Sequence, residues 1–159
     1  MRVAVPIRST IAVLAAAAGV VIVWPSGAGA NNVDLTTCRG ARSDVAGEAA
    51  VFRLVNVERR RRGAAVLKRD ALLARDARRH SVWMARTLRF EHPDAGLAFA
   101  KGAPASQNLA FVSNPRSAVA GFMRSAPHRD NMLPARWRRA GVGTLQCRGM
   151  ILITVNVIG

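Results

Sequence analysis

Aromatic residues are scarce in this sequence. Its 159 residues include no tyrosine, three tryptophans and five phenylalanines. Single-stranded nucleic acids are held on stacked aromatic side chains, and sequence-specific binding needs a recognition motif, which the sequence does not contain. We therefore expect no specific nucleic-acid binding.

Acidic residues are also scarce, with 9 Asp and Glu against 24 Lys and Arg, so the formal net charge is +15. The basic residues are almost all arginines, and the lysines are Lys68 and Lys101. Such a charge attracts polyanions without sequence specificity. A coding bias toward arginine, with the charges on solvated faces, also explains the composition, and we prefer it to a dedicated binding stripe.

The N-terminal apolar run covers residues 11–24 and falls short of the ~20 residues that span a bilayer. Two arginines precede this run, and an A-x-A sequence at 28–30 follows it, which is the anatomy of a secretory signal peptide over residues 1–30. We expect cleavage after Ala30, a secreted chain beginning at Asn31, and no stable membrane anchor after cleavage. The alternative is an uncleaved membrane anchor.

The sequence has two cysteines, Cys38 and Cys147. A signal peptide would carry them to an oxidising compartment, so we predict that they form a disulfide. The loop that it closes would hold about 110 residues, for which the chain-entropy model gives an upper figure of about 4 to 5 kcal/mol.

Residues 31–42 are expected to form an extended arm, followed by a first helix that Ser43 or Asp44 caps and Gly63 ends. Four arginines at 59–62 would lie solvated in its last turn, where the helix dipole favours positive charge. Its apolar stripe is predicted from side chains at helical spacing: Val45, Ala49, Phe52, Val55 and Val57.

Asp70 is expected to cap a second helix that runs to about Thr87. One face of this helix carries residues spaced by three or four: Leu73, Ala77, His80 and Met84. We therefore expect His80 to point toward the core and to bond to backbone. After this helix, Pro93 and three later breakers, Gly96, Gly102 and Pro104, predict a loop.

Asn114 and Pro115 predict the start of a third helix, whose buried stripe would be Val119, Phe122 and Met123. Because Pro127 cannot continue this helix, we expect residues 128–131, His-Arg-Asp-Asn, at a helix C-terminus or in a loop. There they would either brace the backbone or orient a cleft.

Residues 142–147 and 150–158 read as two strands joined by a turn at Arg148-Gly149. The second strand is apolar on both faces, so helices should cover both sides of the sheet. The sequence thus predicts a single α+β domain, an α-β-α sandwich with a small antiparallel sheet between helices.

Four runs resemble motifs of the CAP superfamily, which groups cysteine-rich secretory proteins, antigen 5 and pathogenesis-related proteins. They are similar, in order, to LVNxERxxxGxxxLxxDxxLxxxAxxHSxxMA, FSH, GENIA and SPGHRxNIL. The runs here are residues 54–85, Phe90-Glu91-His92, residues 106–110 (SQNLA) and residues 125–133 (SAPHRDNML). The resemblance implies the α-β-α sandwich of CAP domains over residues 51–159, with 31–50 as an arm and the start of the first helix.

Many CAP proteins carry two histidines and two glutamates around a central cavity that can bind a divalent metal. The resemblance places His92 at the first histidine and Gln107 at a glutamate, with Ile153 at the second histidine and Leu97 near the other glutamate. One ligand of four would remain. We therefore expect no metal and no cofactor.

The candidate site is a small cleft lined by His92, Gln107, Asn108 and His128. We interpret the chain as a non-catalytic binding module for a small-molecule, lipid, glycan or protein ligand. One alternative is a hydrolase that uses histidines and serines such as Ser81 or Ser125, although no G-x-S-x-G motif is present. The other is a basic envelope protein that adheres to polyanions.

Overall fold

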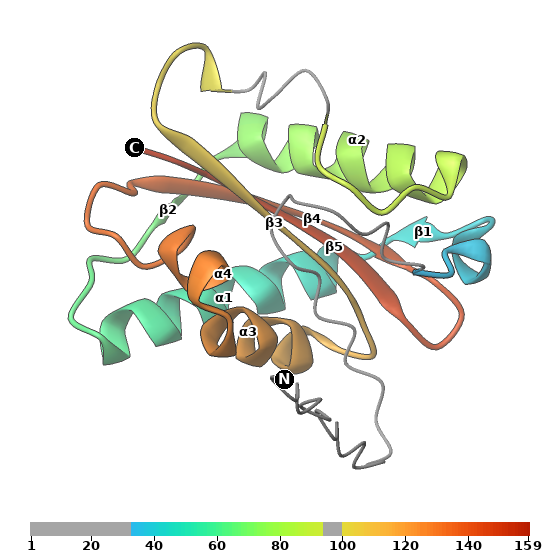
Figure 1. The fold of residues 1–159 in the computed structure, drawn as a ribbon, viewed down its shortest axis with the longest axis horizontal. Coiled ribbons are helices and arrows are strands. Elements are labelled where there is room, and N and C mark those ends of the chain that lie inside the picture. Colours follow the sequence, from blue (N-terminus) through green and yellow to red (C-terminus); the bar gives the residue numbers. More distant parts are fainter. Residues whose placement is uncertain (1–32, 94–99) are drawn as a thin grey trace, which may run out of the picture.

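A computed structural model of the protein describes residues 33–93 and 100–159, so the predicted signal peptide and Leu97 lie outside the described residues. The described chain forms three layers (Figure 1). One helix, α2 (Ala71–Thr87), covers one face of a sheet, and α1 (Val45–Arg61), α3 (Pro115–Arg124) and α4 (Ala126–Asp130) cover the other. The predicted α-β-α sandwich of the α+β class is confirmed. No helix of the described part is long and apolar enough to cross a membrane.

The three long helices begin at the predicted caps. The Asp44 carboxylate accepts a hydrogen bond of 2.8 Å from the Gly47 amide, and Asp70 accepts from the amides of Leu72 and Leu73 at 2.9 and 3.1 Å. Asn114 accepts from the third amide of α3 at 2.9 Å. Each cap satisfies amides that have no partner inside the helix.

His128, Arg129 and Asp130 form the C-terminal end of α4, a five-residue helix, and Asn131 is its C-cap, so they lie at a helix C-terminus as expected, although this short helix itself was not predicted. The chain does leave α3 at Ser125. Pro127 then falls in the first turn of α4, where its missing N–H costs no hydrogen bond. Proline therefore ends one helix and starts the next.

The sheet has the strand order β1-β4-β5-β3. The predicted hairpin is formed by β4 (Arg139–Gln146) and β5 (Ile151–Ile158), and β5 is buried along its whole length. The strand β3 (Ala105–Val112), which was not predicted from the sequence, pairs with β5 over all eight residues. Two short strands, β1 (Arg42–Ser43) and β2 (Lys68–Arg69), pair with opposite ends of β4.

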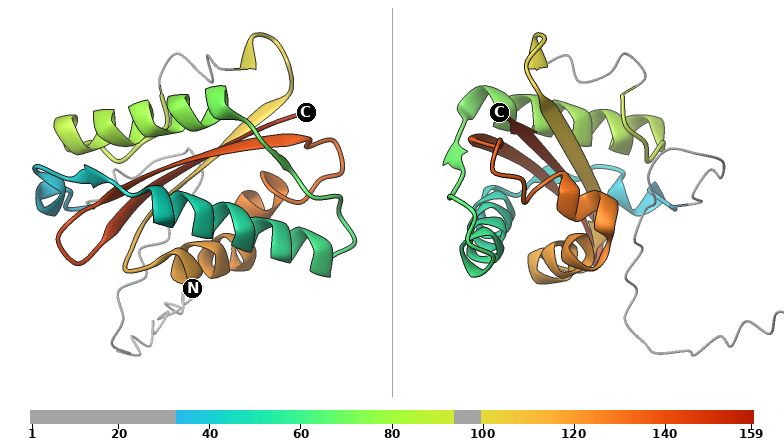
Figure 2. Two further views of the ribbon diagram at one scale, coloured as in Figure 1. Left: turned by 180° about the vertical axis from the view of Figure 1, so that it is seen from behind. Right: turned by 60° about the vertical axis from the view of Figure 1, so that its left-hand side comes forward.

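Two glycines of β4 let α2 lie directly on the sheet. A Cβ atom at Gly141 would fall 2.0 Å from the Ala74 amide nitrogen, and one at Gly143 would fall 2.2 Å from the Arg78 amide nitrogen. Only a residue without a side chain fits beneath the helix backbone at these positions. Figure 2 shows this helix running close along one face of the sheet.

The buried face of α1 differs from the predicted stripe. Val45 is 63% exposed, whereas Val51, Val55 and Arg59 are buried. Arg59 was expected in solvent, yet it is fully buried, because carbonyl groups of the chain around it accept its N–H groups. The apolar side chains of α1 and α3 pack together against the sheet, while those of α2 form a separate cluster on the other face.

Cys38 and Cys147 form the predicted disulfide. Cys38 ends η1 (Thr36–Cys38), a single 3-10 turn, so the arm is not simply extended. Cys147 directly follows β4. The bond therefore ties the start of the described chain to the end of a sheet strand.

Candidate functional site

A chain of hydrogen bonds runs from His92 into the sheet. Nδ1 of His92 lies 2.8 Å from Oε1 of Gln107, and Nε2 of Gln107 donates to Oδ1 of Asn156 at 2.9 Å. Nδ2 of Asn156 in turn donates to the Leu73 carbonyl at 3.4 Å. Gln107 and Asn156 are opposite one another in the register of β3 and β5, so both amides lie on the α2 face.

The directions of these bonds follow from the groups involved. A glutamine carbonyl oxygen only accepts, so Nδ1 of His92 carries a hydrogen and donates it. When the ring holds one proton, Nε2 is left with a lone pair that can accept a hydrogen bond from a ligand. The last acceptor in this chain of hydrogen bonds is the Leu73 carbonyl of α2. It fixes the orientation of the Asn156 side-chain amide, and through Asn156 that of Gln107.

Asn108 points to the opposite face of β3, because successive residues of a strand alternate. Nδ2 of Asn108 donates to the His128 carbonyl at 2.9 Å, and its Oδ1 accepts from Nδ2 of Asn131 at 2.9 Å. Asn108 thus holds α4 against the sheet edge. The strand separates the four predicted residues into two pairs, His92 with Gln107 and Asn108 with His128.

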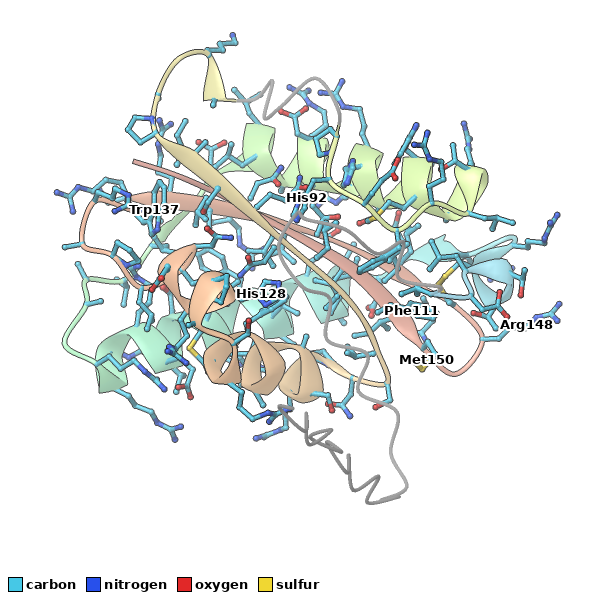
Figure 3. The ribbon with its side chains drawn as sticks, in the orientation of Figure 1. His92, Phe111, His128, Trp137, Arg148 and Met150 are labelled. Atoms are coloured by element: carbon cyan, nitrogen blue, oxygen red, sulfur yellow. A yellow bond between two sulfur atoms is a disulfide. The ribbon has the colours of Figure 1, made fainter. Side chains whose placement is uncertain are left out.

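His128 is 6% exposed, and its ring centroid lies 5.5 Å from that of Phe122. Its Nδ1 is buried and has no hydrogen-bond partner in the described part of the chain. Burial lowers the pKa of His128, and the positive charge of a protonated His92 lowers that pKa further. Figure 3 shows His92 toward α2 and His128 on α4.

His80 makes the predicted bond to backbone, with Nε2 2.9 Å from the Glu91 carbonyl. It is only partly buried, however, and stacks on Trp83 with ring centroids 5.5 Å apart. Burial lowers the pKa of His80, and its bond to the Glu91 carbonyl opposes this effect. Because Glu91 precedes His92, this contact positions the segment that carries His92, a role that was not predicted from the sequence.

Ile153 lies away from His92. Its side chain is fully buried in the cluster formed with α1 and α3, on the face opposite Gln107. The residues of β5 that face α2 are Leu152, Thr154 and Asn156. The position at which the resemblance places a second histidine therefore does not lie on the face of the sheet that carries Gln107.

The hydroxyls of Ser81 and Ser106 are engaged by groups other than a histidine. Ser81 is fully buried, and its hydroxyl lies 2.8 Å from that of Thr154 and donates to the Gly143 carbonyl. Ser106 donates to the Asn131 carbonyl at 2.8 Å. Within residues 33–93 and 100–159, no group of three or more His, Cys, Asp or Glu side chains is placed to hold a metal ion.

Two hollows lie elsewhere on the molecule. One, of about 300 Å³, lies between α1 and α2 beside Val142 and contains the Glu48 carboxylate, which binds Arg78 through two contacts of 2.6 and 2.5 Å. The other, of about 470 Å³, lies along the outer side of α2 around Trp83. Neither hollow is lined by His92 or His128.

Solved structures share this arrangement. An extracellular protein containing an SCP domain from Bacillus anthracis is 28% identical with a TM-score of 0.63, covering 71% of this chain and 40% of that one. An outer surface protein from Borrelia burgdorferi is 12% identical with a TM-score of 0.66, covering 74% of this chain and 97% of the other. Venom allergen-like protein 4 from Schistosoma mansoni is 15% identical with a TM-score of 0.55, covering 70% and 87%.

The present chain thus spans less than half of the Bacillus anthracis protein, and the two more distant structures share its fold alone. No curated protein matches the sequence. The family model of the cysteine-rich secretory protein family, CAP, matches residues 52–156, which include the second half of α1, all of α2 and α3, the strands β3 and β4, and most of β5. Because this model matches more than half of the chain and the sandwich fold agrees with it, the chain belongs to the cysteine-rich secretory protein family.

Proposed function

We propose that this chain is a secreted CAP protein that binds a ligand at His92 and does not catalyse a reaction. The observation that supports this most directly is the hydrogen bond between His92 and Gln107. Where a carboxylate could compensate the charge of an imidazolium or a metal, the chain has a neutral amide that is itself fixed by Asn156. The site offers hydrogen-bonding groups and no strong base.

The ligand that suits this site is a neutral or weakly polar molecule with a hydroxyl or N–H group. Such a group would donate to Nε2 of His92, the ring nitrogen that Gln107 does not occupy. A small molecule, a lipid headgroup, a glycan or a protein side chain can supply it. A hydrolase is less well supported, because Ser81 and Ser106 are engaged by Thr154 and by backbone carbonyls.

Secretion is part of the proposal. It is supported by the signal-peptide anatomy of residues 1–30 and by the description of the Bacillus anthracis relative as extracellular. Mass spectrometry of the protein from culture medium should find Asn31 at its N-terminus. A chain that retains Met1 and stays in the membrane fraction would overturn this part.

The binding function is tested by identifying what co-purifies with the secreted protein. Wild type is compared with His92→Phe, which keeps a ring and removes both nitrogens, and with Gln146→Leu, which removes an exposed glutamine far from His92 along the sheet. We expect one compound enriched on wild type and Gln146→Leu and lost from His92→Phe. Equal recovery from all three proteins contradicts the site. Covalent labelling by a serine-hydrolase probe that disappears on mutating one serine contradicts the non-catalytic assignment.

A further inference from the structure

Eight exposed basic side chains meet at the end of the molecule opposite the disulfide. They come from the end of α1 and the nearby strand β2, and from the chain entering β4, which is about 70 residues further along; these segments lie together at the left of Figure 1. We call this surface the basic end, and its members are Arg60, Arg61, Arg62, Lys68, Arg69, Arg136, Arg138 and Arg139.

The fold itself brings these charges together. The parallel pairing of β2 with β4 sets Lys68 opposite Arg139, and like charges in that position repel. The buried guanidinium of Arg59 donates to the carbonyls of Ala65, Met132, Pro134 and Trp137, which ties the turn after α1 to the segment before β4. Burial lowers the pKa of Arg59, and the nearby charge of Arg138 adds to this.

Carboxylates neutralise only part of the basic end. Glu58 pairs with Arg61 and Arg62, and Asp70 pairs with Arg139 at 2.9 Å. In the part of the chain that the structure describes, the other five basic side chains form no ion pair.

Two of these five are held on aromatic rings. The guanidinium of Arg69 lies 4.9 Å from the ring centre of Phe52, and that of Arg136 lies 4.4 Å from the ring of Trp137. A ring orients a cation without cancelling its charge. The basic end therefore presents oriented guanidinium groups whose charge is not neutralised by a carboxylate of the described chain.

Small apolar side chains protrude between these charges. Val66 is 48% exposed in the turn between Arg62 and Lys68, and Ala65 beside it is exposed too. Ala135 is also exposed, next to Arg136 in the segment that precedes β4. Apolar tips surrounded by arginines suit the boundary between lipid headgroups and acyl chains.

We propose that the basic end docks the protein on an anionic lipid surface. Phosphate groups would bind the unpaired guanidinium groups while the turn around Val66 enters the headgroup region. A nucleic acid fits less well, since the ring of Trp137 is 97% buried and cannot stack on bases. This docking is peripheral and reversible, and it is independent of the ligand site at His92.

The test uses the chain that begins at Asn31, which carries every described element. Its sedimentation with phosphatidylcholine vesicles is measured with and without phosphatidylglycerol. The first variant removes three unpaired charges of the basic end, Lys68→Gln, Arg136→Gln and Arg138→Gln. The matched control removes three exposed charges elsewhere, Arg39→Gln, Arg116→Gln and Arg148→Gln, so both variants have the same net charge.

We expect wild type and control to bind the anionic vesicles alike, and the first variant to lose roughly 100-fold in affinity, at about five-fold per charge. Val66→Glu, a single exposed change, should also weaken binding, while His92→Phe should not alter it. If both triple variants lose the same affinity for the anionic vesicles, net charge alone explains the binding and the proposal is overturned. Equal binding to neutral vesicles would overturn it, as would tighter binding to DNA or to an acidic polysaccharide with the same dependence on the basic end.

Discussion

Nδ1 of His92 is hydrogen-bonded to Oε1 of Gln107 at 2.8 Å, so Nε2 is the ring nitrogen left to face a ligand. This relationship links the proposed binding site to the stability of the sheet, because the same glutamine bonds to Asn156 on the central strand. Changes at Gln107 should therefore be visible both in binding and in unfolding.

Gln107→Leu should lower the free energy of unfolding by about 1 to 3 kcal/mol, because it leaves the buried Oδ1 of Asn156 without its donor. Urea denaturation followed by circular dichroism measures the loss. Gln146→Leu, at an exposed position, should cost clearly less. Equal losses in the two variants would mean that the buried amide chain adds nothing specific.

The protein should bind no Zn²⁺ at micromolar concentration. A zinc site needs about three or four converging N, S or carboxylate ligands, and Gln107 supplies a neutral amide where a carboxylate would be needed. Isothermal titration calorimetry on the chain from Asn31 onward checks this. Stoichiometric binding that disappears in His92→Ala would contradict the prediction.

Stability should fall as the pH drops below about 6.5, the ordinary pKa of histidine. Burial lowers the pKa of His128 in the folded state, so the unfolded state binds more protons between the two pKa values, and acid favours unfolding. The stabilisation is present in full above pH 6.5 and is lost as the pH falls through the folded pKa.

His80 titrates with the same sign, because burial also lowers its pKa. Urea unfolding at several pH values should therefore show a shallower pH dependence for His128→Gln and for His80→Gln than for wild type. An unchanged slope in both variants would assign the acid sensitivity to other groups.

Gly143→Ala should destabilise the fold by more than about 3 kcal/mol, because a Cβ atom would lie 2.2 Å from the backbone of α2. Gly40→Ala is the matched control. Gly40 has a φ of 72° and no atom near the added Cβ, so its replacement should cost only about 1 kcal/mol of backbone strain. Thermal unfolding of both variants separates the steric effect from the conformational one.

Arg59→Leu should cost about 3 to 5 kcal/mol, since the carbonyls that Arg59 binds become buried without donors. Arg60→Leu, at the exposed neighbouring position, should change stability by less than about 0.5 kcal/mol. Denaturation midpoints compare the two. If both variants lose similarly little stability, Arg59 is solvated, as its position in the run of arginines suggested.

The three long helices and the hairpin could be predicted from the sequence because their signals are local. Asp44, Asp70 and Asn114 each cap amides within three residues, and the Arg148-Gly149 turn joins two apolar strands directly. The burial of β5 on both faces also gave the layering correctly, since only helices on both sides of the sheet can cover it.

The missing parts depend on contacts between distant segments. The strand β3 opens with the polar residues Ser106, Gln107 and Asn108, which are buried only because β5, α2 and α4 supply their partners. Arg59 stands in a run of arginines, and nothing in the run indicates which of them meets the carbonyls of residues 132–137. For the same reason the candidate residues could be named but not assigned to a face of the sheet.

The disulfide makes one covalent ring of the chain from Cys38 to Cys147, with β5 outside it. A protease that cuts once inside the ring, for example in the exposed turn at Gly63, would leave both pieces on one molecule. The nicked protein would keep its full mass on a gel until it was reduced. A cut after Arg148 would instead leave the peptide of β5 without a covalent link, held by its pairing with β3 and β4 and by its contacts with α2. Single cuts in the turns between its helices would therefore not break this protein apart.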